Sequence, residues 1–363
     1  MSSSPNGLTP YPIVQAPMAG GASCPLLAAA VCEAGGLGFL AGGYKTADGM
    51  YQEIKQVRAL TRRPFGVNLV MPQTGCVDPA AVEAYRGQLA GEASWYGISL
   101  ADEDVYSTCD DGYEAKLAIL LEDPVAAVSF TFGCPGASAL AALRKAGTRT
   151  TVTVTSVEEA RTAQHAGADA LCVQGVEAGG HQGTHRDDPQ ADGTAAVGLL
   201  ALVGQVRESV SLPIIAAGGL MRGSQIAAVL AAGAEAAQLG TAFLACPESG
   251  ADPLHKKSLT DPLFVRTELT RAFSGRPARG LVNRFMREHG PYAPAAYPQV
   301  HHLTSALRRA AAAAGDPQGM ALWAGQGHRL ARTLPAGELV EVLAAELAEA
   351  QSALKAMQMR SAS

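Results

Sequence analysis

Eight short apolar runs alternate along the chain with alanine-rich segments in which apolar residues recur at helical spacing. In most of these segments, among them 24–36, 138–147, 156–167 and 224–235, glycine follows the last predicted turn, as it often does where a helix ends. Apolar strands that alternate with helices are typical of a parallel sheet covered on both faces. The apolar runs predict strands at 12–16, 37–41, 65–70, 126–131, 150–154, 170–174, 213–217 and 236–239.

Eight βα units within roughly 235 residues favour a closed (β/α)8 TIM barrel, an α/β fold, over an open doubly wound sheet, which usually has fewer strands. We place the barrel at residues 1–250. Residues 251–363 exceed what a barrel needs, and we interpret them as the helix that closes the barrel plus a C-terminal α-helical extension. Their pattern predicts helices at 262–274, 280–288, 300–314 and 336–357.

Two intervals between predicted strands and helices are unusually long. Residues 73–124 form an insertion that contains an acidic, aromatic segment at 94–114, and residues 182–197 form a polar loop. Both follow strands, so we expect both near the active-site face at the carboxyl ends of the strands. Loops of this length in a compact domain are usually binding loops or lids.

The composition excludes several classes of protein. With 48% apolar and 17% charged residues, the 363-residue chain has ample surface to bury and is not a disordered protein. A net charge of −5 without a dense basic block argues against a nucleic-acid partner. Charged residues interrupt the long apolar stretches, so we expect no membrane span. The first residues lack the features of a secretion signal, and we expect a cytoplasmic protein.

The pattern of cysteine and histidine residues gives no sign of a metal site. Seven cysteines, at 24, 32, 76, 109, 134, 172 and 246, are scattered without a C-x-x-C pair, which favours neither a disulfide framework nor a zinc cluster. His181 and His185 have the spacing of paired zinc ligands, but the glutamate after the first histidine is missing and Gly183 lies between them. We therefore expect no metal.

Glycines at the ends of the last two predicted strands indicate a phosphate site. Gly218 and Gly219 follow the seventh strand, and Gly240 and Thr241 follow the eighth, where TIM barrels bind phosphate groups. Glycine lets backbone N–H groups approach phosphate oxygens closely, and we expect the helix that begins near Ser224 to add its positive end. The alternative is that these glycines only form tight turns.

The sixth predicted strand leads into a candidate catalytic loop. Gln174 lies near the strand end, and Gly179, Gly180 and His181 follow in a segment that faces the same site. Two glycines before an imidazole allow it to lie over a flat ligand, and a neutral histidine can take or share a proton near pH 7. A solvated loop histidine is the alternative for His181.

Three further features lie at or near strand ends. Asn68, within an otherwise apolar strand, needs a hydrogen-bond partner if it is buried, and a ligand amide or ring nitrogen would supply one. Met18 could pack on a ring edge or simply fill the core. The segment 36–41 fits a G-x-G-x-x-A dinucleotide fingerprint, but it follows a predicted helix and is itself a strand, so we discard that interpretation.

Taken together, the motifs resemble those of the FMN-dependent nitronate monooxygenases, formerly called 2-nitropropane dioxygenases. The resemblance runs in the family's order from about residue 12 to 327 and rests on seven motifs: PIVQAPMAGG, GGLGFLAGG, PFGVNLVMP, VQGVEAGGHQG, PIIAAGGL, AAQLGTAFL and WAGQG. It implies a TIM barrel with an α-helical extension that binds one FMN. It also implies oxidation of alkyl nitronates by O₂ to a carbonyl compound and nitrite, without a metal.

The resemblance also implies roles for individual residues. His181 would be the catalytic histidine near the substrate nitro group, where it holds the anionic group or removes the α proton of a neutral nitroalkane. Gly180 is a further candidate for cofactor binding. The implied FMN contacts come from Met18, Asn68, Gln174, Gly179, Gly218, Gly219, Gln238, Gly240 and Thr241.

Three alternatives to this function remain. An FMN-dependent NAD(P)H enoyl-acyl-carrier-protein reductase shares the barrel and a similar loop around His181. The inosine-monophosphate-dehydrogenase type needs a nucleophilic cysteine after the sixth strand, and residues 175–181 contain none, which disfavours it. A flavin-binding protein without catalysis is the third. For the enzyme, the expected partners are a small-molecule nitronate and O₂, and a homodimer is a further expectation.

Overall fold

The computed structural model describes residues 7–73, 77–100, 110–187 and 196–361. Eight parallel strands form one sheet in the order β1-β9-β8-β6-β5-β4-β3-β2. A parallel bridge between Val14 and Leu37 joins the first and last strands of this order, so the sheet closes on itself. All eight predicted strands are confirmed, as β1 (Ile13–Gln15), β2 (Phe39–Ala41), β3 (Gly66–Val70), β4 (Ala127–Thr131), β5 (Arg149–Val154), β6 (Ala170–Gln174), β8 (Ile214–Ala217) and β9 (Ala236–Leu239).

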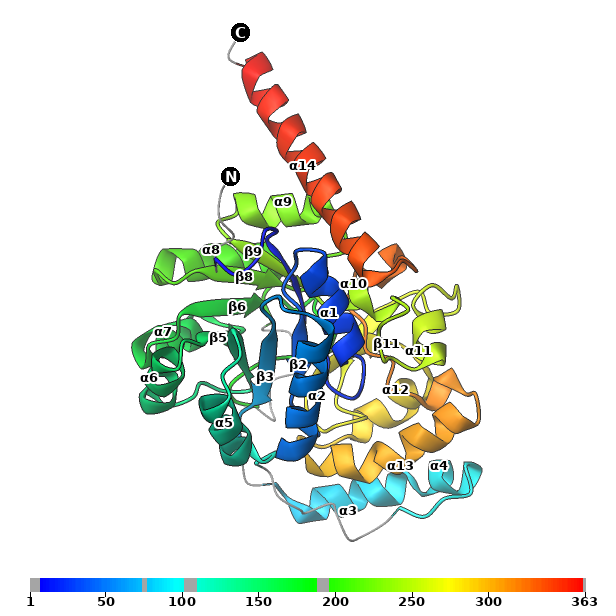
Figure 1. Ribbon diagram of the computed structural model, residues 1–363. Coiled ribbons are helices and arrows are strands. Elements are labelled where there is room, and N and C mark those ends of the chain that lie inside the picture. The colour runs from blue at the N-terminus through cyan, green and yellow to red at the C-terminus, as the bar shows by residue number, and fades with distance from the viewer. Residues whose placement is uncertain (1–6, 74–76, 101–109, 188–195, 362–363) are drawn as a thin grey trace.

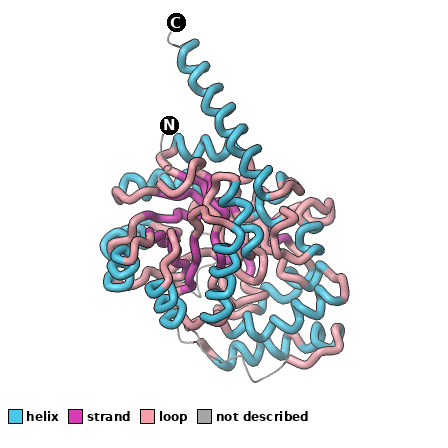
Figure 2. Tube along the Cα trace, in the orientation of Figure 1, coloured by secondary structure: helices cyan, strands magenta, loops and turns pink. Residues whose placement is uncertain are grey.

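Helices surround the strands and cover their apolar outer faces (Figures 1 and 2). The start and end signals are local: in α7 the Ser156 hydroxyl accepts a hydrogen bond from Glu159 N, and the helix ends at Gly167 in the left-handed conformation. The helices that follow the strands are α1 (Pro25–Glu33), α2 (Ala47–Leu60), α5 (Tyr113–Glu122), α6 (Ala137–Lys145), α7 (Val157–Ala166), α8 (Leu199–Ser209) and α9 (Gly223–Ala231). The prediction of a (β/α)8 barrel is confirmed.

The last helix, α14 (Ala336–Ser361), completes the ring around the barrel. It packs against α9 and α1, the helices that follow β8 and β1. Leu339, Val340 and Leu343 on α14 are buried in the core that the helices share with the outer faces of the strands. The helix that closes the barrel therefore comes last in the chain, after the extension. The domain boundary near residue 250 stays a prediction.

The insertion at 73–124 contains helices where the sequence predicted a long loop: α3 (Pro79–Gln88), α4 (Ala90–Trp95) and then α5. Val82, Tyr85 and Leu89 are buried in a cluster with residues of the extension, which gives these short helices a core to pack on. Residues 74–76 and 101–109 of the insertion, which include Cys76 and Cys109, lie outside the described residues, as do 188–195 of the polar loop.

The extension is only partly helical. The predicted helices at 300–314 and 336–357 correspond to α13 (Gln299–Ala313) and α14. The helix predicted at 262–274 is wrong, because β10 (Thr267–Thr270) lies there. The prediction at 280–288 is wrong at its start, where β11 (Ala278–Leu281) precedes α12 (Arg284–His289). β11 pairs with β10 and with β7 (Gly180–His181), and this long-range pairing overrides local helical spacing. The short helices α10 (Thr241–Leu244) and α11 (Pro253–Ser258) precede these strands.

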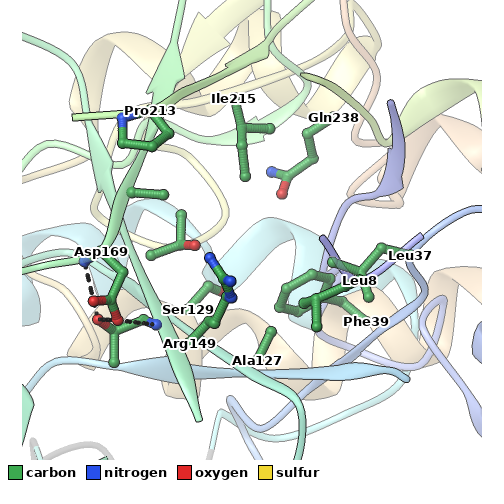
Figure 3. Close-up of a pocket in the computed structure, with 13 residues that line it drawn as sticks. Leu8, Leu37, Phe39, Ala127, Ser129, Arg149, Asp169, Pro213, Ile215 and Gln238 are labelled. Carbon is green, nitrogen blue, oxygen red and sulfur yellow. Dashed lines mark hydrogen bonds between the residues drawn. The ribbon is translucent and has the colours of Figure 1, made fainter. Parts of the chain in front are cut away.

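Side chains fill the amino-terminal end of the barrel interior. Val14, Phe39 and Ile215 form a small apolar cluster there, against which Leu8 packs. A cavity of only about 20 Å³ remains beside Arg149 (Figure 3). That volume holds about one water molecule and no organic ligand, so a binding site must lie at the other end of the strands. Within the described part of the chain, no helix is long and apolar enough to cross a membrane.

Candidate active site

A cavity of about 360 Å³ opens at the carboxyl ends of the barrel strands, between the barrel and the extension. Its size is in the range of small-molecule and cofactor sites. Eleven residues that the sequence indicated as candidates line it: Met18, Asn68, Gln174, Gly179, Gly180, His181, Gly218, Gly219, Gln238, Gly240 and Thr241.

Gly218 and Gly219 form a backbone cradle at one end of this cavity. Both have left-handed backbone conformations, with φ of 127° and 71°, which side chains rarely adopt. A Cβ on Gly219 would lie 3.0 Å from the Cβ of Glu177. The N–H groups of both glycines donate to no other group among the described residues. Unpaired amides beside a cavity suit the oxygens of a phosphate group.

The sequence predicted that the helix beginning near Ser224, which is α9, would support this cradle, but its amino terminus binds another group. The first amide of α9, at Gly223, donates to a carboxylate oxygen of Glu346 on α14 at 2.8 Å. A Cβ on Gly223 would collide with the backbone of Leu347, so α14 packs directly on this helix end. The prediction that the helix near Ser224 points its positive end at the phosphate site is therefore wrong, because a carboxylate of the chain already occupies that end.

The WAGQG segment of the extension closes over the glycine loops of the barrel. Gly325 N donates to Thr241 Oγ1 at 2.9 Å, and Gln326 N donates to Glu177 O at 3.0 Å. A Cβ on Gly179 would lie 2.4 Å from Gly325 N, so only glycine allows this approach of the two backbones. Trp323 from the same segment also lines the cavity.

A layer of polar side chains forms the floor of the cavity inside the barrel. The Asn68 amide nitrogen donates to Ser129 Oγ and Thr131 Oγ1 at 2.9 and 3.0 Å, so the neighbouring strand β4 supplies the partner that the sequence assigned to a ligand. Its Oδ1 has no partner among the described residues. Gln174 donates to His181 O and accepts from Gly183 N, so it holds the loop that carries His181 as well as lining the cavity.

His181 is anchored at the junction of the two parts of the protein. Its backbone pairs with β11, and its Nε2 lies 2.8 Å from Ser274 Oγ. The rings of Phe132, Tyr297 and Trp323 meet the imidazole at centroid distances of 5.6 to 5.7 Å. Burial, and then nearby guanidinium groups, lower the pKa of His181 to about 3, so its ring is neutral at physiological pH.

The family model for nitronate monooxygenase matches residues 5–346. The chain belongs to the nitronate monooxygenase family. It is 43% identical over 349 residues to a nitronate monooxygenase of Paraburkholderia phytofirmans, covering 95% of this chain and 94% of the relative. It is 45% identical over 342 residues to a nitronate monooxygenase of Pseudomonas aeruginosa, covering 93% and 96%.

Among solved structures, the nitroalkane oxidase of Streptomyces ansochromogenes is 71% identical with a TM-score of 0.93, and the match covers 96% of this chain and 99% of that one. FabK of Thermotoga maritima is more distant. It is 29% identical with a TM-score of 0.72, over 96% of both chains.

Two guanidinium groups near His181, those of Arg276 and Arg308, were not predicted from the sequence. Arg276 is fully buried, donates to Gln73 Oε1 and Thr184 O, and lies 3.9 Å over the ring of Phe132. Arg308 on α13 lines the cavity and donates to Thr304 Oγ1 and the backbone of His301. Neither makes an ion pair with a carboxylate among the described residues.

His301 and Tyr44 bring the extension and the barrel together at the cavity wall. Their rings stack at a centroid distance of 4.1 Å and an angle of 4°. His301 Nδ1 lies 3.3 Å from Arg308 Nη2, and since a guanidinium only donates, the ring proton of His301 is on Nε2. His301, Thr304 and Arg308 are three and four positions apart in a predicted helix, so they share one helix face. That spacing is the signal from which the group could have been predicted.

One group of three possible metal ligands occurs in the described part of the chain, away from the cavity. Atoms of Glu92, Glu288 and His289 lie within 4.8 Å of one another. Both carboxylates are already paired with Arg284, whose positive charge occupies the position that a cation would take.

Proposed function

We propose that this protein oxidises alkyl nitronates with O₂ to a carbonyl compound and nitrite, using FMN. Its membership of the nitronate monooxygenase family supports this activity. The observation that carries the proposal is the cavity itself, where unpaired glycine amides lie at one end and a neutral imidazole beside two guanidinium groups lies at the other. Such a site suits a phosphate-bearing ring together with a small anionic substrate.

The residues of the cavity fit FMN, and the family is flavin-dependent. The free N–H groups of Gly218 and Gly219 would hold the phosphate, with Gly240 and Thr241 beside them on the next strand. Asn68 Oδ1 and the side chains of Gln174, Gln238 and Met18 would contact the ring system. When bound, the flavin would supply the redox chemistry between nitronate and oxygen.

The protein itself binds, orients and shields the nitronate. Arg276 and Arg308 lie close enough to His181 to lower its pKa, and their positive charge attracts an anion. The Nδ1 atom of His181 has no partner among the described residues and is the ring nitrogen left for the nitro group. Phe132, Tyr297 and Trp323 surround the imidazole and exclude water, which strengthens these interactions.

The test begins with the purified protein and its released flavin. We expect a yellow protein that releases FMN on heating. Mixed anaerobically with propionate 3-nitronate, the flavin should lose its oxidised absorbance, and admitting O₂ should restore it with release of nitrite. In a separate mixture NADH should have no such effect. Rapid bleaching by NADH without reaction with the nitronate would instead identify the enoyl-acyl-carrier-protein reductase activity, and a colourless protein would contradict both.

We also propose a cytoplasmic location and a homodimer, which stay predictions from the sequence. Size-exclusion chromatography with light scattering would measure the oligomeric state. The division of the chain into a barrel at 1–250 and an extension after it is likewise a proposal. In this division the last helix, α14, belongs to the barrel wall although it follows the extension in the chain.

A further inference from the structure

Ser274 holds a fixed position in the turn between β10 and β11. Only 1% of its surface is exposed. The next residue, Gly275, has a left-handed φ of 79° and donates to Arg271 O at 2.8 Å, while its carbonyl accepts from Ala296 N at 3.1 Å. The turn therefore places the Ser274 hydroxyl on the cavity wall with little freedom to move.

The hydroxyl of Ser274 has two possible acceptors for its single proton. One is the Arg276 carbonyl oxygen at 3.2 Å, and the other is His181 Nε2 at 2.8 Å. When the proton goes to Arg276 O, the serine oxygen accepts a hydrogen bond from His181 Nε2–H and leaves a lone pair on Nδ1. When it goes to His181 Nε2, the imidazole proton must be on Nδ1.

No other polar contact of the imidazole competes with Ser274. Among the described residues Ser274 is the hydrogen-bond partner of the ring, and three aromatic rings lie around it. The ring is neutral, so exactly one of its nitrogens carries a proton at a time. The orientation of one serine hydroxyl thus decides whether Nδ1 donates or accepts.

We propose that Ser274 is a positioning residue that sets the tautomer of His181 and thereby lets one site take both nitronates and neutral nitroalkanes. This inference rests on the proposed function and extends it. For a nitronate, Ser274 donates to Nε2, and Nδ1–H donates to a negatively charged nitro oxygen. For a nitroalkane, Ser274 accepts from Nε2–H, and the Nδ1 lone pair takes the α proton.

The proton transfer from the nitroalkane balances within the site. The C–H bond breaks, its electron pair forms the C=N bond of the nitronate, and the negative charge moves to the nitro oxygens. The resulting imidazolium keeps Nε2–H on Ser274 and Nδ1–H beside the new anion. An adjacent anion stabilises the imidazolium, and the guanidinium groups of Arg276 and Arg308 stabilise the anion.

The test compares Ser274→Ala with Ser274→Thr on nitroethane and on ethyl nitronate. In the alanine variant Nε2 faces a methyl group, and since a buried N–H without a partner is costlier than a buried lone pair, the Nδ1–H tautomer dominates. We expect kcat/KM for nitroethane to fall about 10-fold to 100-fold and that for ethyl nitronate to change less than about 3-fold. Threonine keeps the hydroxyl and should restore both values.

A second measurement reports the tautomer without turnover. ¹⁵N spectra of the histidine-labelled protein should show the Nδ1 signal of His181 moving toward the protonated position in Ser274→Ala and not in Ser274→Thr. Ser258→Ala is the matched control, because Ser258 is also buried and its hydroxyl donates to a backbone carbonyl, that of Leu254. If Ser274→Ala does not fold, Ser274→Cys should shift both readouts in the same direction.

The outcomes separate this inference from the proposed function. Equal losses on both substrates, or unchanged rates and spectra in Ser274→Ala, would overturn the tautomer role and leave nitronate oxidation intact. A wild-type enzyme that oxidises ethyl nitronate but not nitroethane would also overturn it. A wild-type enzyme that oxidises neither would contradict the proposed function itself.

Discussion

The backbone of His181 pairs with that of Ala278, so a strand of the extension holds the loop that follows β6 of the barrel. The pairing continues between Gly180 and Arg279, and Gln182 N donates to Pro277 O at 2.8 Å. The imidazole is thus positioned from both sides of the junction. The extension helps to form the candidate active site because it supplies Ser274, His301 and Arg308 to the cavity that His181 lines.

Replacing His181 with asparagine should separate catalysis from cofactor binding. The His181→Asn variant keeps a polar side chain but loses the imidazole, so we expect normal flavin content and a fall in kcat/KM of about 100-fold or more. Absorbance gives the flavin-to-protein ratio, and nitrite release gives the rate. His165→Asn on the exposed face of α7 is the control. Loss of FMN with full activity per remaining flavin would contradict the role assigned to His181.

Replacing Gly179 with alanine should loosen the closure of the extension over the flavin site. The new Cβ would meet Gly325 N at 2.4 Å and the carbonyl carbon of Ala324 at 2.6 Å, so the backbone must move. We expect flavin affinity to fall about 10-fold or more, at a cost of about 1–3 kcal/mol. Titration of the apoprotein, followed by flavin fluorescence, measures the affinity.

Gly204→Ala provides the matched control for this substitution. Gly204 lies within α8, and a Cβ there would meet no atom within 4 Å. Alanine should leave flavin affinity unchanged and stabilise the helix by about 0.5–1 kcal/mol. Equal flavin affinity in both variants and the wild type would show that the approach of Gly179 to Gly325 does not shape the site.

The barrel was predictable because its signals are local. Each strand lies in an apolar run of four to six residues, and helices such as α7 carry a start signal, Ser156, and an end signal, Gly167. The position of Gly218 and Gly219 was predictable for the same reason, since they follow a strand directly and line the cavity at the strand ends. Chain order then placed them at one end of the barrel.

The extension was less predictable because distant partners determine it. β11 exists as a strand through its pairing with β10 and with Gly180 and His181, which are about a hundred residues away in the chain. Ser274 was not predicted as a site residue for the same reason, because its partner His181 is 93 positions away in the chain and nothing in the local sequence indicates the contact. The predicted role of the α9 amino terminus was wrong for a different reason. Its first amide, at Gly223, binds the carboxylate of Glu346 on α14, which is distant in the sequence.

Removing the charge of Arg308 should weaken the binding of anionic substrates. Burial lowers the pKa of Arg308 to about 10, which still leaves it charged at physiological pH. We expect Arg308→Met to raise KM for ethyl nitronate about 10-fold, with a smaller effect on neutral nitroethane. Arg308→Lys should recover part of the loss, and the neighbouring, exposed Arg309→Met is the control. Equal effects on both substrates would contradict an electrostatic role.

Acid should destabilise the fold through the enclosed imidazoles. The pKa of His181 is lowered to about 3 and that of His301 is also lowered, in both cases mainly by burial, whereas each is near 6.5 in the unfolded chain. Between these values the unfolded state binds more protons, so the free energy of unfolding falls as pH drops below about 6.5. Each histidine contributes at most about 1.4 kcal/mol per pH unit.

Urea unfolding at several pH values between 7.5 and 5 measures this dependence. His301→Phe keeps a ring to stack on Tyr44 but cannot titrate, so its stability should fall less steeply with decreasing pH than that of the wild type. Arg308 would also lose its contact with Nδ1 of His301, which lowers stability equally at every pH and does not change the slope. A slope equal to that of the wild type would mean that His301 binds as many protons in the folded protein as in the unfolded chain, so that folding does not lower its pKa.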